Sequence, residues 1–208
     1  IIEIDGKILF QSFQLIYVYN PLTNTLTNLQ AKKGFSNLFF SKKRGFFQDV
    51  SIGLFEIIND TKSKLIKGTE NISMDEEDNS ILIATKNNGF WCLKNNVLLK
   101  KDWIENTKFK KFILTDIEKY KSNQFIVGTL RNGFYIISDK GKIITHINKI
   151  QGLNNNAILK VFNDFHNNIW LSTESGISYI EVNSNAKYFL DTNSNFGTVY
   201  TTFLKDSI

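Results

Sequence analysis

Cysteine, proline and long apolar runs are almost absent from this sequence of 208 residues. Cys92 is the only cysteine, so no disulfide bond can form within the chain. The longest apolar runs fall far short of the roughly 20 residues that a membrane-spanning helix needs. The sequence opens at Ile1-Ile2-Glu3, with neither an initiator methionine nor a signal sequence. We therefore expect an excerpt of a longer protein, in which missing targeting signals carry no weight.

Arginine is also scarce, because Arg44 and Arg131 are the only two among 25 basic residues. Arginine is the side chain that contacts phosphate and guanine through paired hydrogen bonds. The net charge of +5 comes instead from lysines that are scattered along the chain in short clusters. We interpret these lysines as a solvated surface and expect no nucleic acid to bind to this segment.

The residue types that are abundant in this sequence favour β-structure. The chain contains 18 phenylalanines, and 13% of its residues are aromatic. Phenylalanine, isoleucine, tyrosine and valine suit the pleated, half-buried surface of a sheet. Hydrophobic residues make up 42% and charged residues 22%, which is ordinary for a soluble globular protein.

Internal repeats organise the sequence. Three segments align almost without gaps: 79–93, 123–137 and 167–180. A threonine at the end of the first apolar run recurs at intervals of 44 residues, as Thr85, Thr129 and Thr173. Two weaker copies lie upstream, at 7–19 and 45–57.

Each position of the repeat has a physical reason. Three consecutive apolar residues, as in Ile81-Leu82-Ile83, are typical of a strand that is buried on both faces. The next residue is small (Ala84, Gly128 or Ser172), which lets adjacent sheets approach closely. Polar residues and a glycine then indicate a tight hairpin, after which a second apolar strand returns. A further strand precedes each hairpin and a fourth follows it.

Four short antiparallel strands in every 40 to 50 residues, roughly, are typical of a β-propeller blade. An immunoglobulin-like sandwich also has short strands but lacks this self-similarity. We therefore predict an all-β fold, a β-propeller segment of about five four-stranded antiparallel blades. The predicted repeats are 1–37, 38–68, 69–112, 113–156 and 157–203. Residues 204–208 are the predicted start of a further blade. Because residues 197–208 resemble an inner strand cut off before its hairpin, we expect an arc of a larger ring of the seven-bladed type.

The last repeat resembles a known family. Gly152–Ile158 and Asp164–Ile177 follow the pattern of the two-component-regulator propeller repeat. That pattern runs Gly-Leu-Ser-Asn-Asn, an inner strand, Asp, Asn-Ile-Trp, a small residue, Thr, then Gly-Leu and an aromatic residue. Gly34–Asn37 repeats its opening element. The tryptophan of the pattern is replaced by Ile126 and Leu82 in two other repeats, and no polar residue recurs in every blade as a shared ligand.

The resemblance implies a periplasmic, extracytoplasmic sensor region of a membrane-anchored protein, common in Bacteroidetes. Such regions are joined through a three-tyrosine β-sandwich and a membrane helix, both outside this segment, to an output domain. The output is a histidine kinase or a helix-turn-helix regulator of the LuxR type. The resemblance therefore implies a non-catalytic sensory propeller that binds an unknown extracellular ligand, for instance a glycan, in a protein that forms a homodimer and controls transcription.

No residue pattern indicates catalysis, a metal or a cofactor. The acidic run Asp75-Glu76-Glu77-Asp78 lacks the spacing of a calcium loop, and we expect a solvated turn between the first two strands of a blade. His146 and His166 have no carboxylate or cysteine at ligand spacing, which argues against zinc. Cys92 lies within an apolar strand, so we interpret it as a buried structural thiol.

Propeller geometry favours ligand binding by loops and inner strands at one rim of the central channel. The candidate ligand-binding residues are Asn154, Asn155, Asn156, Lys160, Asn163, Asp116 and Trp103. Trp103 lies between two blades and is expected to be the more exposed tryptophan, whereas Trp91 and Trp170 occupy positions for packing between blades.

Two alternative functions stay open. One is a propeller enzyme that acts on polysaccharide, either a lyase or a glycosidase. It would need paired carboxylates, or a His/Tyr/Arg constellation, at matching positions of the repeats, and the sequence offers none. The other is a purely structural scaffold for dimerisation.

Overall fold

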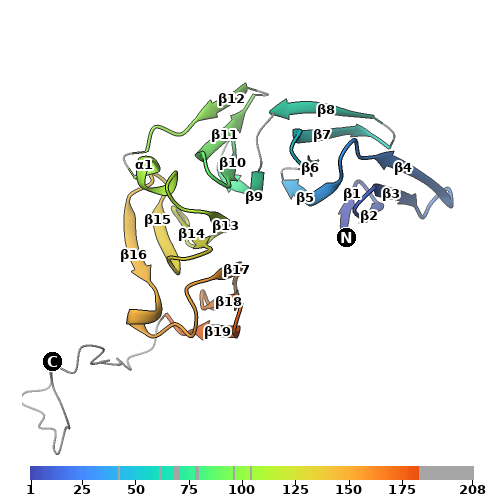
Figure 1. Ribbon diagram of the computed structural model, residues 1–208. Coiled ribbons are helices and arrows are strands. Elements are labelled where there is room, and N and C mark those ends of the chain that lie inside the picture. Colours follow the sequence, from blue (N-terminus) through green and yellow to red (C-terminus); the bar gives the residue numbers. More distant parts are fainter. Residues whose placement is uncertain are drawn as a thin grey trace, which may run out of the picture.

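The computed structural model describes residues 1–41, 43–60, 62–67, 71–77, 80–95, 97–103 and 105–182. Within these ranges the chain forms five antiparallel sheets that follow one another along an arc (Figure 1). In every sheet the strands are hydrogen-bonded to each other in the order of the sequence. No helix in these ranges is long and apolar enough to cross a bilayer.

The strands divide among the sheets as follows. The first sheet contains β1 (Ile2–Ile4), β2 (Lys7–Gln11), β3 (Leu15–Asn20) and β4 (Thr25–Gln30). The second contains β5 (Phe35–Ser41), β6 (Arg44–Asp49), β7 (Gly53–Asn59) and β8 (Lys62–Lys67). The third contains β9 (Asn71–Glu77), β10 (Ser80–Thr85), β11 (Gly89–Lys94) and β12 (Val97–Lys100). The fourth contains β13 (Leu114–Lys119), β14 (Gln124–Thr129), β15 (Phe134–Ser138) and β16 (Ile143–Ile147), and the fifth contains β17 (Ile158–Asn163), β18 (Ile169–Thr173) and β19 (Gly176–Ile180).

This arrangement confirms the predicted fold class, an all-β arc of a propeller. Four sheets have four strands, and the fifth has three within the described residues. The first strand of each sheet lies on the concave side of the arc, and in the four-stranded sheets the fourth strand lies on the convex side (Figure 1). The predicted start of a further blade lies outside the described residues, and the repeat boundaries stay a prediction.

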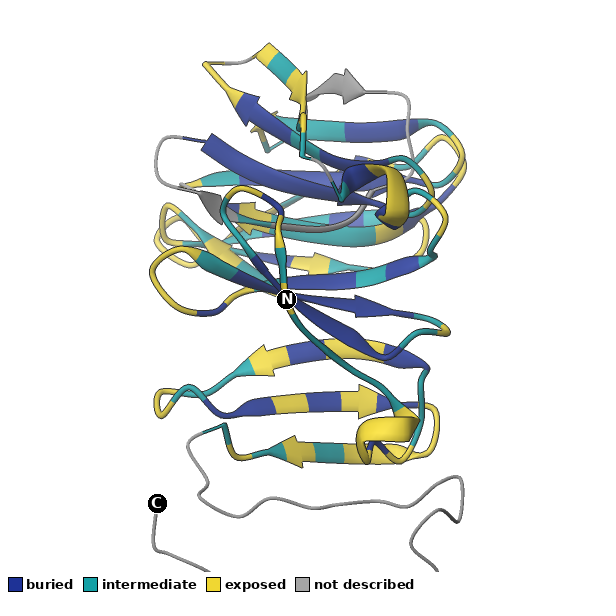
Figure 2. Cartoon of the chain, turned by 90° about the vertical axis from the view of Figure 1, so that its left-hand side faces the viewer, coloured by how far each residue is buried: buried dark blue, intermediate teal, exposed yellow. Residues whose placement is uncertain are grey.

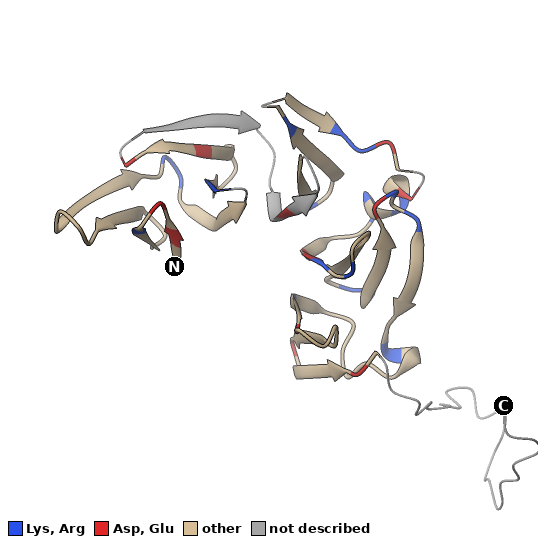
Figure 3. Ribbon diagram, turned by 180° about the vertical axis from the view of Figure 1, so that it is seen from behind, with Lys and Arg blue, Asp and Glu red and all other residues tan. Residues whose placement is uncertain are grey.

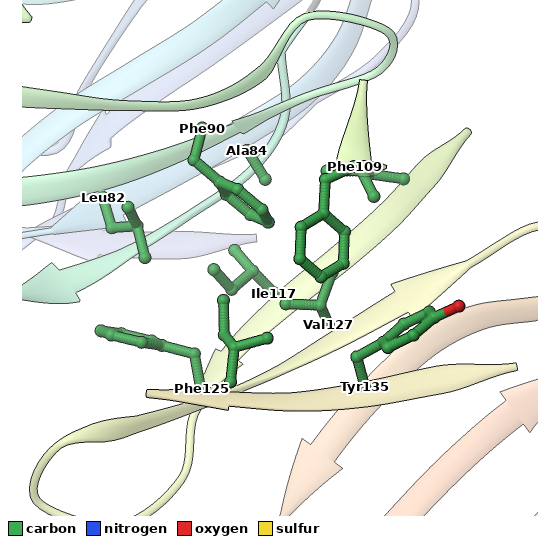
Figure 4. Close-up of a cluster of buried hydrophobic side chains, with 10 residues drawn as sticks. Leu82, Ala84, Phe90, Phe109, Ile117, Phe125, Val127 and Tyr135 are labelled. Carbon is green, nitrogen blue, oxygen red and sulfur yellow. The ribbon is translucent and has the colours of Figure 1, made fainter. Parts of the chain in front are cut away.

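Consecutive apolar residues of one strand pack against different neighbouring sheets. In β10, Ile81 and Ile83 pack with Phe46 of the second sheet. Leu82 and Ala84, which alternate with them, pack with residues of the fourth sheet and with the one-turn helix α1 (Asn106–Phe109) (Figure 4). A sheet that is sandwiched between two others buries both faces, which explains the uninterrupted apolar runs of the repeat.

The fifth sheet has two different faces within the described residues. Along β18, Ile169 and Leu171 are buried against the fourth sheet, and strand alternation places Trp170 on the opposite face. Figure 2 shows buried and exposed residues alternating along the strands of this sheet. The side chain of Trp170 is 41% exposed there, and its indole Nε1 donates a hydrogen bond to Asp164 at 3.1 Å. The expectation that Trp170 packs between two blades stays a prediction, because the strand alternation places it on the face away from the fourth sheet and the predicted further blade lies outside the described residues.

The recurring threonine closes the hairpin of its repeat. The buried hydroxyl of Thr129 donates to the carbonyl of Gly133 at 2.7 Å and accepts the backbone N–H of Asn132 at 3.0 Å. Thr85 makes the same two bonds within its own hairpin, with Gly89 at 2.6 Å and Asn88 at 3.1 Å. Both bonds need a hydroxyl at the end of the strand, which accounts for the threonine at this register.

Replacing Thr129 with valine removes that hydroxyl and keeps the shape of the side chain. We expect the free energy of unfolding to fall by about 1–3 kcal/mol, because the buried hairpin groups lose their partner. Urea denaturation measures this change. Thr25→Val, at an exposed position of β4, is the matched control and should change stability by less than about 0.5 kcal/mol. Equal effects of the two substitutions would contradict the assigned role of Thr129.

Candidate functional site

Side chains from three sheets meet on the concave side of the arc. A cavity of about 310 Å³ lies there, which we call the inner-strand pocket. Its lining comes from β5, β13 and β17 and comprises Asn37, Leu38, Phe39, Phe40, Asp116, Ile117, Glu118, Lys160 and Val161. Because β5 and β17 are far apart in the sequence, only the curvature of the arc brings these side chains to one cavity.

The register of the sheets explains why these strands contribute equivalent residues. In each of the three sheets, a β-bulge interrupts the pairing of the inner strand after its first residue. The residue that follows the bulge is Asn37, Asp116 or Lys160, and each is paired with the residue just before the hairpin. Bulges re-aim side chains. Polar side chains thus stand at one level of the concave wall, supplied by different blades.

Asp116 connects two neighbouring inner strands. Its carboxylate is 4% exposed and accepts the backbone N–H of Val161 at 3.0 Å and the ammonium of Lys160 at 3.2 Å. The side chain of Lys160 is 64% exposed, so this ion pair is open to solvent on one side. The predicted candidates Asp116 and Lys160 are therefore brought together, with the lysine ammonium accessible from the channel.

Glu118 lies two residues beyond Asp116 on the same strand and lines the same pocket. Burial, and after it the nearby carboxylates of Asp75 and Asp116, raise the pKa of its carboxyl to about 7, against the opposing effect of Lys160. A carboxyl with this pKa changes its charge near neutral pH. The inner-strand pocket thus holds a group that donates a hydrogen bond when protonated and accepts hydrogen bonds when ionised.

The raised pKa of Glu118 makes stability depend on pH. Since the pKa rises from 4.5 to about 7 on folding, the folded state binds this proton more tightly, and the group destabilises the fold progressively as pH rises through that range. Glu118→Gln should therefore gain about 1–2 kcal/mol of unfolding free energy at about pH 8, after allowance for solvent screening. The gain should vanish at about pH 4, as measured by urea denaturation across the range. A gain that is independent of pH would contradict this assignment.

Asp75, Glu76 and Glu77 of the acidic run belong to strand β9 and do not form a solvated turn. Asp75 lies inside β9, which continues to Glu77, and its carboxylate accepts the backbone N–H of Lys119 on the neighbouring inner strand. The expectation of a turn is therefore wrong for Asp75–Glu77, while Asp78 lies outside the described residues. The strand continues because the backbone of Asp75 to Glu77 pairs with β10, whatever the polarity of the side chains.

The side chains of the asparagine run Asn154–Asn156 are already hydrogen-bonded within the chain. Asn154 Oδ1 accepts from the hydroxyls of Thr173 and Ser178, at 3.2 and 2.8 Å. Asn155 bonds to Ser175 and to the backbone of Ala157, and Asn156 Oδ1 accepts from Lys149 N at 2.7 Å. None of the three lines the inner-strand pocket. Their part in ligand binding stays a prediction.

The remaining two candidates lie apart from the pocket. Asn163, at the far end of β17, donates to the backbone carbonyls of Lys119 and Tyr120 at 3.5 Å. Trp103 is half-buried, with its ring 5.2 Å from that of Phe90. The expectation of an exposed tryptophan here is wrong, because Phe90 and the close approach of Gly141 cover the indole ring.

Of the nine residues that line the inner-strand pocket, only Asp116 and Lys160 were predicted from the sequence as binding residues. Aligning the inner strands through their hairpins places Asn37 level with Asp116 and Lys160, and that alignment was the available signal. The bulge shifts each inner strand by one residue relative to its partner strand. Spacing along the sequence alone therefore does not reveal the match.

Within the described residues, no group of three or more histidine, cysteine, aspartate or glutamate side chains could hold a metal ion. Cys92 is buried, as predicted, and His166 is exposed. His146 stacks on Tyr135 with ring centroids 4.2 Å apart. Charged residues of both signs are spread over the strands and the connections between them (Figure 3).

Comparison with known proteins yields structural neighbours only. No protein-family model matches the chain, and no curated protein does. An extracellular domain assigned to a hybrid two-component system of B. thetaiotaomicron is 20% identical with a TM-score of 0.67, over 86% of this chain and 26% of that chain. PorZ, a surface component of the type-IX secretion system of Porphyromonas gingivalis, is 16% identical with a TM-score of 0.62, over 82% of this chain and 29% of that chain.

A β-propeller domain from Myceliophteria thermophila is 11% identical with a TM-score of 0.63, over 87% of this chain and 63% of that chain. These neighbours have different roles, and at such identities the likeness shows the propeller fold alone. The chain spans about a quarter of the length of the B. thetaiotaomicron domain.

Proposed function

We propose that this chain is the sensory, ligand-binding propeller region of a bacterial signal-transduction protein that controls transcription, and that it catalyses no reaction itself. The observation that carries the proposal is the inner-strand pocket, where residues from three sheets line one polar cavity. The likeness to an extracellular domain of a hybrid two-component system supports it. On this proposal the region is periplasmic, and the parent protein is anchored by a helix outside this segment and dimerises.

The composition of the pocket favours a hydroxyl-rich ligand such as a glycan fragment. Asn37, Glu118 and Lys160 offer hydrogen-bond donors and acceptors, as recognition of sugar hydroxyls requires. The accessible lining of this pocket is almost entirely polar, which suits the hydroxyl groups of such a ligand.

A thermal-shift screen tests this proposal directly. The panel consists of oligosaccharides of cellulose, xylan, mannan and chondroitin, each followed by chromatography of the sugar after incubation. We expect one class to raise the unfolding temperature saturably and to remain chemically unchanged. Shortened or unsaturated sugar products would instead indicate the polysaccharide-cleaving enzyme. A dimeric chain that responds to no ligand would indicate the structural scaffold.

A further inference from the structure

A second cavity, distinct from the inner-strand pocket, lies between the first two sheets. Its volume is about 300 Å³, and we call it the inter-sheet pocket. It is lined by the β1–β2 hairpin and β3 on one side and by β6 and the end of β7 on the other. The lining residues Ile4, Leu9, Val18 and Ile57 are apolar, and two of them, Leu9 and Val18, are almost fully buried.

Gly45 creates part of this space. A Cβ atom at this position would lie 2.4 Å from Cδ1 of Ile4 and 3.1 Å from Cδ1 of Ile57. Any side chain here would therefore push apolar groups of the pocket wall out of place. The glycine keeps the two sheets close while the cavity beside it stays open.

Four charged residues, besides Arg44, surround the apolar floor. Lys7 and Asp60 form an ion pair across the two sheets, with the ammonium 2.6 and 2.8 Å from the two carboxylate oxygens. Arg44 is bonded to Glu56 at 2.6 Å. Asp5 and Lys43 also line the pocket, and neither has an ion-pair partner among the described residues.

We propose that the inter-sheet pocket binds a free apolar amino acid, whose ammonium pairs with Asp5, whose carboxylate pairs with Lys43 and whose side chain lies on the floor of Ile4, Leu9 and Val18. Such a zwitterion provides an oppositely charged partner for Asp5 and for Lys43. A purely anionic ligand would share the pocket with the carboxylates of Asp5 and Asp60, and a purely cationic one with the ammonium groups of Lys7 and Lys43. The volume is at the lower end of small-molecule pockets and suits a single residue.

Isothermal titration of the chain with L-leucine tests the proposal, with three analogues that each lack one feature. Isocaproate lacks the ammonium, isoamylamine lacks the carboxylate and glycine lacks the apolar side chain. We expect saturable binding of L-leucine and at least about tenfold weaker binding of every analogue. Binding of isocaproate or isoamylamine as tight as that of L-leucine, or the lack of saturable binding of L-leucine, would overturn the proposal.

Substitutions locate the binding site. Asp5→Asn and Lys43→Gln should each weaken L-leucine binding about tenfold, because each removes one charge partner. Asp102→Asn and Lys140→Gln, at exposed positions in other sheets or connections, are the matched controls and should bind like the unmodified chain. Gly45→Ala should weaken binding by narrowing the floor. If Asp5→Asn and Lys43→Gln behave like their controls, the site is not this pocket.

The proposal does not depend on the function proposed for the inner-strand pocket. Lys160→Ala changes that other cavity and should leave L-leucine binding unchanged. Loss of L-leucine binding in Lys160→Ala, with binding retained in Asp5→Asn, would place the amino-acid site on the concave wall and refute the assignment to the inter-sheet pocket.

Discussion

Replacing Gly133 with valine is expected to lower the free energy of unfolding by about 3–5 kcal/mol. Gly133 has a φ of 69°, a left-handed conformation that a β-branched residue adopts only with strain. A Cβ atom there would also lie 2.1 Å from the carbonyl oxygen of Ile147 and 2.9 Å from Cα of Asn148. Since both are backbone atoms, the clash can be relieved only by moving the connection between the fourth and fifth sheets.

Gly6→Val is the matched control for Gly133→Val. Gly6 has a φ of 73°, but nothing lies within 4 Å of the Cβ position. Gly6→Val should therefore lower the free energy of unfolding only by the cost of placing valine in the left-handed conformation, about 1–2 kcal/mol. Urea denaturation compares the two variants. Equal losses of stability would show that the backbone of the connection does not approach the hairpin as closely as the structure places it.

Asp49→Ala is expected to lower the free energy of unfolding by about 3 kcal/mol. Asp49 stands where other repeats have the hairpin threonine, since it pairs with Gly53 as Thr85 pairs with Gly89. Its buried carboxylate accepts the backbone N–H groups of three successive residues in the connection from the first sheet. These residues are Lys32 at 2.8 Å, Lys33 at 3.0 Å and Gly34 at 3.0 Å.

Asp164→Ala provides the control for Asp49→Ala. Asp164 also accepts backbone N–H groups, from His166 at 2.9 Å and Asn168 at 2.8 Å within a single surface turn, and it accepts the indole N–H of the exposed Trp170 at 3.1 Å. Water can replace these bonds when the carboxylate is removed. The loss of stability on thermal or urea denaturation should therefore be clearly smaller than for Asp49→Ala. The reverse order would contradict the role of Asp49 in joining the first two sheets.

The fold was predictable because its main signal is periodic. The 44-residue recurrence of Thr85, Thr129 and Thr173 reflects a hairpin bond that these three repeats share. The apolar runs reflect burial on both faces of the sheets. The strand containing Asp75 was not predictable in this way, because its acidic side chains resemble a turn while its backbone pairs with β10.

The candidate site was predictable only in part. Asp116 and Lys160 lie together on the concave wall, as polar residues of inner strands should in a propeller. The environment of Trp103 depends on Phe90 and Gly141, which are brought to it by tertiary packing and not by the repeat. Glu118 owes its raised pKa to burial and to Asp75 on another sheet, and such a contact has no signature in one sequence.

Titration of the cellulose, xylan, mannan and chondroitin oligosaccharides against the unmodified chain, Lys160→Ala and Lys140→Ala tests the central claim most directly. Lys160 is largely exposed, so its substitution should remove a ligand contact and leave the fold intact. We predict that the unmodified chain binds one sugar class saturably and that the sugar is recovered unchanged. Binding should be about tenfold weaker in Lys160→Ala and unchanged in Lys140→Ala. Equal binding by all three proteins, or a cleaved sugar, would contradict a sensory site on the concave wall.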